Sequence, residues 1–152
     1  MPRVDFYVLE GSEPRPRLVY ACRLAEKAFL LEQRVSILTD SAEDAQQLDD
    51  LLWTFRDRSF VPHERQPAAG EPGTPVVIAF RGETPSHRDL LINLGSEVPP
   101  GVSEYARVAE IVDADAKRRS AGRERYRYYL DQGLKPDTHN IGGTSGGDQE
   151  TQ

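Results

Sequence analysis

Short apolar runs recur along the chain and are separated by longer segments in which apolar residues return with a helical period. Apolar runs occupy residues 4–9 (VDFYVL), 35–38 (VSIL) and 76–80 (VVIAF), each about the length of a buried strand. The third run is rich in β-branched residues, which favour strands. Residues 90–94 (LLINL) and 107–112 (RVAEIV) extend the series of predicted strands.

The segment between the first two strands has the spacing of an amphipathic helix, which we predict to span residues 17–33. Its apolar stripe recurs every three or four residues and consists of Leu18, Cys22, Ala25 and Phe29. Cys22 lies on this stripe and is therefore interpreted as a core residue. Residues 11–16, which include two prolines, are predicted to separate the strand from the helix.

A second helix is predicted to begin at Ser41, because Asp44 follows three residues later in the spacing of a capping box. Its apolar stripe consists of Ala45, Leu48 and Leu52. Beyond this helix the pattern weakens. A short strand is predicted at residues 60–61, ended by Pro62, and a loop at residues 66–75, where three prolines and two glycines occur.

A long final helix is predicted from Asp113 or Asp115, either of which can cap it, to about residue 132, with Gly133 in the C-cap region. One sector of this helix holds Arg119, Arg123, Tyr126, Arg127 and Leu130, and the roughly opposite sector holds Ala114, Ala121 and Tyr128. The second sector is predicted to pack on the sheet, and the arginine and tyrosine side chains to face outward.

The outward sector has the chemistry to bind a peptide that is both acidic and aromatic. Guanidinium groups recognise carboxylates through two parallel hydrogen bonds, and a neighbouring tyrosine can cover an apolar side chain. The alternative is an ordinary exposed helix in which arginines pair with Glu124. That alternative leaves the tyrosines unexplained.

Strands that alternate with helices through short connections predict right-handed crossovers and a largely parallel sheet. We therefore expect a three-layer α/β/α, Rossmann-like fold, with one domain over residues 1–138. Residues 139–152 are rich in glycine and polar residues, have little to bury, and are predicted to form a disordered tail.

Composition narrows the functional classes. The chain has 152 residues and a net charge of -6, which argues against a surface that binds nucleic acid indiscriminately. The charge is uneven, however, because residues 113–127 hold six basic and three acidic residues. One cysteine cannot form an internal disulfide, and neither a signal peptide nor an apolar run of membrane-spanning length is present. These features predict a cytoplasmic protein that does not enter a membrane.

Catalytic motifs are missing from the sequence. Neither GxGxxG nor GxxxxGK[ST] occurs, no GxSxG nucleophile elbow lies between a predicted strand and a predicted helix, and the three histidines lack the spacing of metal ligands. No cofactor or metal is therefore expected. One enzymatic alternative remains, in which Asp5, Asp40 and Asp89 converge from strand ends to hold Mg²⁺ in a metal-dependent phosphoesterase.

Several segments, in order along the chain, resemble the chi subunit family of bacterial DNA polymerase III. They include the DFY.L opening, C.LAEKA, LD.LLW ending at Trp53, SFVPH after Arg58, PV.IA, RD.LINL and RERYR.Y from Arg123. Together they cover nearly all of the chain to about residue 135. Each is short, but the ordered set, above all LLW with SFVPH and RERYR, is specific.

The resemblance implies a Rossmann-like fold without catalysis, cofactor or sequence-specific DNA binding. It implies two partners: the psi subunit, which connects chi to the clamp loader, and the acidic C-terminal tail of single-stranded DNA-binding protein (SSB), which ends in phenylalanine. The residues implied to line the SSB-tail pocket are Trp53, Phe60, Arg123, Tyr126 and Arg127, with Arg119 as a second basic contact. For the two aromatic residues, the alternative from the residues alone is ordinary core packing.

Overall fold

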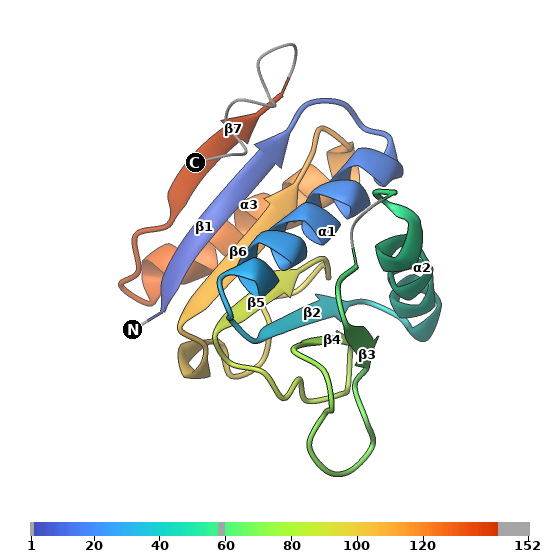
Figure 1. The fold of residues 1–152 in the computed structure, drawn as a ribbon. Helices are drawn as coiled ribbons and strands as arrows, with labels where there is room; N and C mark the ends of the chain where they lie inside the picture. Colours follow the sequence, from blue (N-terminus) through green and yellow to red (C-terminus); the bar gives the residue numbers. More distant parts are fainter. Residues whose placement is uncertain (1, 58–59, 143–152) are drawn as a thin grey trace.

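The chain folds around one parallel sheet, described here from a computed structural model that covers residues 2–57 and 60–142. The strands are β1 (Arg3–Leu9), β2 (Val35–Thr39), β3 (His63–Arg65), β4 (Val76–Phe80), β5 (Leu90–Asn93), β6 (Arg107–Val112) and β7 (Asp137–Ile141). The helices are α1 (Pro14–Leu30), α2 (Ala42–Thr54) and α3 (Ala116–Asp131), with a short 3-10 turn at Val102–Glu104. The sheet order is β3-β4-β2-β5-β6-β1-β7, and every neighbouring pair is parallel (Figure 1).

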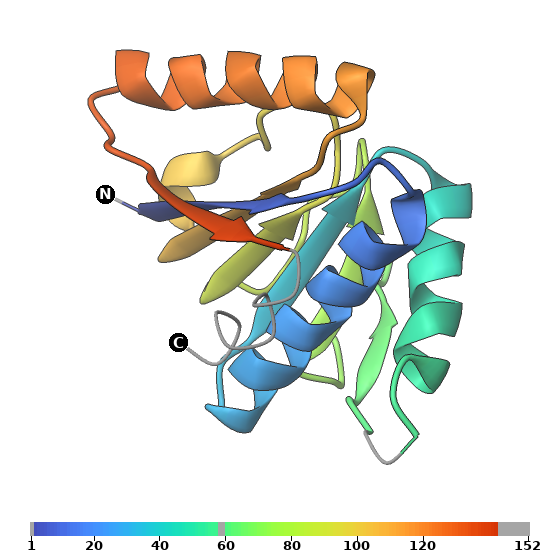
Figure 2. The same ribbon diagram turned by 90° about the horizontal axis from the view of Figure 1, so that it is seen from above.

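Helices cover both faces of the sheet, which confirms the predicted three-layer α/β class. Figure 2 shows α1 and α2 on one face and α3 on the other. Side chains of β1 alternate between the two layers, because successive residues of a strand point to opposite faces. Phe6 packs in the core beneath α3, and Tyr7 packs in the core beneath α1, where its ring lies 5.4 Å from that of Tyr20.

The predicted strands at residues 4–9, 35–38, 76–80, 90–94 and 107–112 are confirmed to within about a residue at each end. Helix α1 begins at Pro14, three residues earlier than predicted. Its two prolines lie in the first turn, where backbone N–H groups have no partner within the helix, so proline starts this helix instead of interrupting it.

The strand predicted at residues 60–61 was wrong. Phe60 is exposed, and pairing with β4 begins only at His63, after Pro62. Proline fixes its own backbone angle and cannot donate to a sheet, so the strand begins on its far side.

The C-terminal boundary also differs from the prediction. Strand β7 pairs with β1 over Asp137–Ile141, so residues 139–141 belong to the sheet and not to a tail. The DTHNI sequence of β7 has no apolar run, because an edge strand exposes most of its side chains. The rest of the predicted tail, from residue 143 onward, lies outside the described residues. Among the described helices, none has the length and apolar character to cross a membrane.

Candidate functional site

The first turn of α3 is anchored by two aspartates. The Asp115 carboxylate caps the helix by accepting a hydrogen bond from the Arg118 backbone N–H at 3.0 Å, and this bond lowers the pKa of Asp115 below its ordinary value. The Arg118 side chain in turn pairs with Asp113 at 2.8 Å. Of the two predicted caps, Asp115 is therefore the one that caps the helix, while Asp113 pairs with the Arg118 side chain.

The buried face of α3 consists of Gly122, Arg125 and Tyr129, and differs from the predicted one. Tyr128, predicted to face the sheet, is 41% exposed, and Ala121 is half-buried. A Cβ atom at position 122 would lie 2.7 Å from Val112 Cγ1, so glycine allows the helix to approach β6 closely.

A buried polar cluster attaches α3 to the sheet. The Glu110 carboxylate of β6 accepts hydrogen bonds from Arg125 Nε at 2.8 Å and from the Tyr129 hydroxyl at 2.6 Å. Asn93 Nδ2 of β5 donates to both oxygens of the same carboxylate at 3.0 and 3.1 Å. Burial and the adjacent Glu110 charge raise the pKa of Tyr129, which stays protonated and donates. The cluster fixes the rotation of α3 about its axis.

This cluster was missed in the sequence. Glu110 stands alone in an apolar strand, a position where a carboxylate needs a partner. Arg125 and Tyr129 are four residues apart and hence on one helix face. An isolated acid in a predicted core strand, followed by an Arg/Tyr pair in the next helix, was the available signal.

Because the Glu110 cluster holds one face of α3 against the sheet, another face points away from it. We name this row the α3 basic face: Arg119, Arg123, Tyr126 and Arg127. The three arginines are exposed, four residues apart, and no side-chain hydrogen bond or ion pair involves them within the described residues. Tyr126 is half-buried at the border of the row, with its ring centroid 5.1 Å from that of Phe6. Leu130 extends the row and is largely exposed. The structure thus brings four of the six predicted site residues together.

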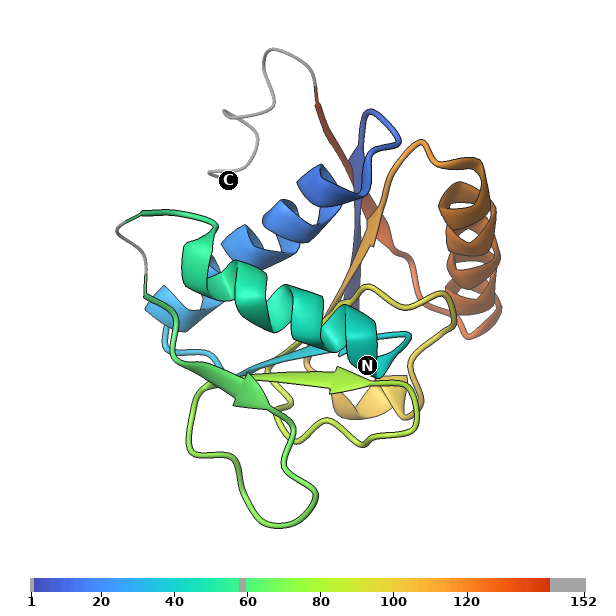
Figure 3. The same ribbon diagram turned by 90° about the vertical axis from the view of Figure 1, so that its right-hand side faces the viewer.

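The other two predicted residues form a separate surface, which we name the aromatic patch: Trp53 and Phe60. They are 53% and 63% exposed, and their ring centroids are 5.7 Å apart. Trp53 also packs on His63 at 4.6 Å. The patch belongs to the end of α2 and the segment before β3, and Figure 3 shows α2 and α3 on opposite sides of the sheet. The patch and the basic face therefore do not form a single pocket.

The three carboxylates of the metal-site alternative do not converge. Asp40 follows the carboxyl end of β2 and pairs with Arg81 at 2.6 Å, whereas Asp89 precedes β5 at the amino edge of the sheet and accepts from the Arg34 backbone N–H at 2.8 Å. Asp5 is buried within β1. No group of three potential ligands occurs in residues 2–57 and 60–142. The alternative was therefore wrong, because these strand positions lie at different edges of a parallel sheet.

Comparisons with known proteins identify the family of this chain. Residues 1–137 match the family model described as "DNA polymerase III chi subunit, HolC". A Pseudomonas aeruginosa protein named DNA polymerase III subunit chi is 42% identical over 144 residues, covering 93% of this chain and 98% of that protein. The Haemophilus influenzae protein of the same name is 31% identical over 139 residues, covering 91% and 96%.

Among solved structures, the fold resembles part of "The crystal structure of T4 UvsW", with a TM-score of 0.62 and 11% sequence identity. The match covers 92% of this chain and 41% of that one, and at this identity it concerns the fold alone. The agreement of family model and relatives over almost the whole length places the chain in the family of DNA polymerase III chi subunits.

Proposed function

We propose that this chain is a non-catalytic adapter subunit of the DNA polymerase III holoenzyme that binds the C-terminal tail of SSB through the α3 basic face. The observation that carries the proposal is the row of three arginines beside Tyr126, none of which makes a side-chain hydrogen bond or ion pair with another described residue. Exposed guanidinium groups that pair with no carboxylate in the described part of the chain are available to a carboxylate from another molecule.

The chemistry of the row fits a short acidic peptide that ends in an aromatic residue. Arginines four residues apart follow one line along a helix, so an extended peptide can place successive carboxylates over them. The half-buried Tyr126 ring offers an apolar surface at the border of the row. The buried Glu110 cluster holds the helix in one orientation, which reduces the entropy lost on binding.

A second surface is needed for an adapter, and we assign the aromatic patch to it. Exposed Trp and Phe side chains in contact are typical of protein interfaces, where aromatic residues are enriched. Because the patch lies on the α2 side of the sheet, a partner there leaves the α3 side open. We propose that Trp53 and Phe60 receive the psi subunit, which links the chain to the clamp loader.

A titration of the full chain with a fluorescent peptide of the SSB tail tests the proposal. We expect saturable binding that weakens strongly when the terminal phenylalanine is removed from the peptide, since a purely electrostatic contact would not sense that residue. Single-stranded oligonucleotide without SSB serves as the comparison ligand. Absence of peptide binding, or tighter binding of the oligonucleotide, would refute the proposal.

A further inference from the structure

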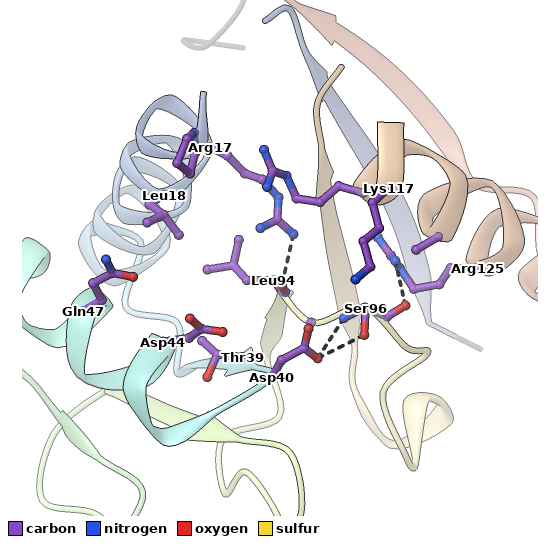
Figure 4. A pocket seen from close by; sticks show the side chains of 14 residues that line it. Arg17, Leu18, Thr39, Asp40, Asp44, Gln47, Leu94, Ser96, Lys117 and Arg125 are labelled. Carbon is purple, nitrogen blue, oxygen red and sulfur yellow. Dashed lines mark hydrogen bonds between the residues drawn. The ribbon is translucent and has the colours of Figure 1, made fainter. Parts of the chain in front are cut away.

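A cavity of about 340 Å³ opens at the carboxyl end of the sheet, apart from both surfaces described above. Its floor is formed by the strand ends at Thr39 and Leu94, and the first turns of three helices border it at Pro14, Asp44 and Lys117 (Figure 4). In open α/β sheets, the crevice outside the carboxyl ends of the strands is where ligands usually bind.

Arg17 of α1 is a buried cation that lines this cavity and makes no ion pair or hydrogen bond with a carboxylate among the described residues. Arg17 is 8% exposed. Its guanidinium donates from Nε to the Ile111 carbonyl at 2.8 Å and from Nη2 to the Leu94 carbonyl at 3.0 Å. Both acceptors are neutral, and Nη1 has no acceptor within the described residues. Burial, and then repulsion from Arg118, lower the pKa of Arg17 to about 10 although the nearby Asp113 and Glu110 charges act to raise it, so the group remains charged at neutral pH.

A second cation without an ion pair faces the same space. Figure 4 shows the Lys117 side chain reaching from α3 toward Ser96 and Asp40. No ion pair of Lys117 occurs in the part of the chain that the structure describes.

The remaining charges around the cavity are largely balanced. Arg118 and Arg125 are paired with Asp113 and Glu110, and Asp40 is paired with Arg81. Asp44 is the one lining acid without an ion pair among the described residues. Among the described residues, two cations without an ion pair thus line the cavity with one carboxylate without an ion pair, and the excess charge of these three groups is positive.

We propose that this cavity binds a small oxyanion of the phosphate class, with the Arg17 guanidinium and the Lys117 ammonium as its charged donors. Burying a cation whose hydrogen bonds go only to neutral carbonyls is costly, and an anion in direct contact with it in the cavity offsets part of that cost. The site uses side-chain charge and has no glycine-rich backbone loop, so it is distinct from the phosphate-binding motifs absent from the sequence. The phosphate can be free or belong to a mononucleotide.

Titration of the ¹⁵N-labelled full chain with inorganic phosphate at constant ionic strength, followed by NMR, tests this site. We expect the Gly95 and Ser96 amide signals to shift and saturate with phosphate but not with added chloride. Lys117→Gln should weaken this binding by roughly tenfold, as expected for one charge-assisted contact. Lys135→Gln removes an exposed charge beyond the other end of α3 and should leave the affinity unchanged.

A parallel titration with AMP identifies the source of the phosphate, since tighter binding of AMP indicates a nucleotide and tighter binding of phosphate the free anion. Arg17→Gln, if folded, should abolish saturation. Lys117→Gln is at an exposed position, and it keeps the test decisive if the Arg17 variant does not fold. The proposal would be overturned by amide shifts that fail to saturate or by an unchanged phosphate affinity in Lys117→Gln. It would also be overturned if the only amide signals that shift and saturate were those of Arg123 and Arg127. The titration with the SSB-tail peptide tests the α3 basic face and not this cavity. The tail-binding proposal and the phosphate-binding proposal can therefore be refuted independently.

Discussion

At the scale of single residues, Arg123 lies at the centre of the α3 basic face and is the most direct test of tail binding. A charge-assisted hydrogen bond contributes about 1.5–3 kcal/mol, so Arg123→Ala should weaken binding of the SSB-tail peptide by roughly one to two orders of magnitude. Arg123→Lys should recover part of the loss, because an ammonium cannot make the planar two-point contact of a guanidinium. Fluorescence anisotropy of a labelled peptide measures both.

Salt provides the control for this prediction. Screening acts on the charge that the substitution removes, so added salt should weaken wild-type binding more steeply than binding to Arg123→Ala. A folded Arg123→Ala variant that binds like wild type would place the tail elsewhere on the molecule.

Also at the scale of single residues, the lowered pKa of Asp5 leads us to expect that the stability of the fold depends on pH. Burial alone would raise its pKa, but hydrogen bonds from His139 at 2.9 Å and Arg107 at 3.0 Å, together with the nearby arginine charges, lower it below its ordinary value. A depressed folded-state pKa contributes stability above the unfolded value, and this stability is lost as pH falls. Urea unfolding should therefore show stability declining below about pH 5 and more steeply below pH 4.

The Asp5→Asn variant separates this effect from general acid sensitivity. It keeps the shape of the side chain but cannot titrate, so its stability should vary less with pH than that of wild type over the same range. Equal slopes for the two proteins would show that Asp5 does not contribute to the acid dependence.

At the scale of elements, the buried Glu110–Arg125 pair decides which face of α3 meets the sheet. Arg125→Met should destabilise the fold by about 3–5 kcal/mol, because it leaves the Glu110 carboxylate buried without its cation. The matched substitution Arg127→Met, two residues away on the exposed side, should change stability by no more than about 0.5 kcal/mol. Denaturant unfolding of both variants measures the difference.

A similar loss in both variants would mean that the pair contributes nothing specific. Adding Glu110→Gln to Arg125→Met removes the uncompensated charge and should recover part of the stability. That recovery is a property of the pair and not of helix propensity, since methionine and arginine have similar propensities.

At the scale of the whole molecule, the sheet separates the two proposed partner surfaces. The combined variant Trp53→Ala/Phe60→Ala should change the affinity for the SSB-tail peptide by less than about twofold, since distant sites act independently. The same variant should lose co-purification with the psi subunit, whereas Arg123→Ala should retain it. A strong loss of tail binding in the aromatic variant would mean that both surfaces contribute to one interface.

Much of the architecture was predictable because it is encoded locally. The apolar runs gave five strands, since a strand buried on both faces reads as a continuous apolar segment. The Asp115 and Ser41 caps gave two helix starts, because a cap acts within one turn. Strand β7 was not predicted, because an edge strand does not need a continuous apolar segment.

The tertiary structure alone decided on which face of the sheet each helix packs, and therefore which distant residues lie close together. The sequence by itself determined the α/β class, the parallel sheet and the outward arginine row of Arg119, Arg123 and Arg127, all of which follow from period, spacing and capping. The resemblance to the chi family implied that Trp53 lines one pocket with that row, whereas α2, which carries Trp53, lies across the sheet from α3. The fold also brings Arg17 and Lys117, which are far apart in the chain, to one cavity. Such contacts have no local signature, because they arise from the packing of α1 and α3 on opposite faces of the same strand ends.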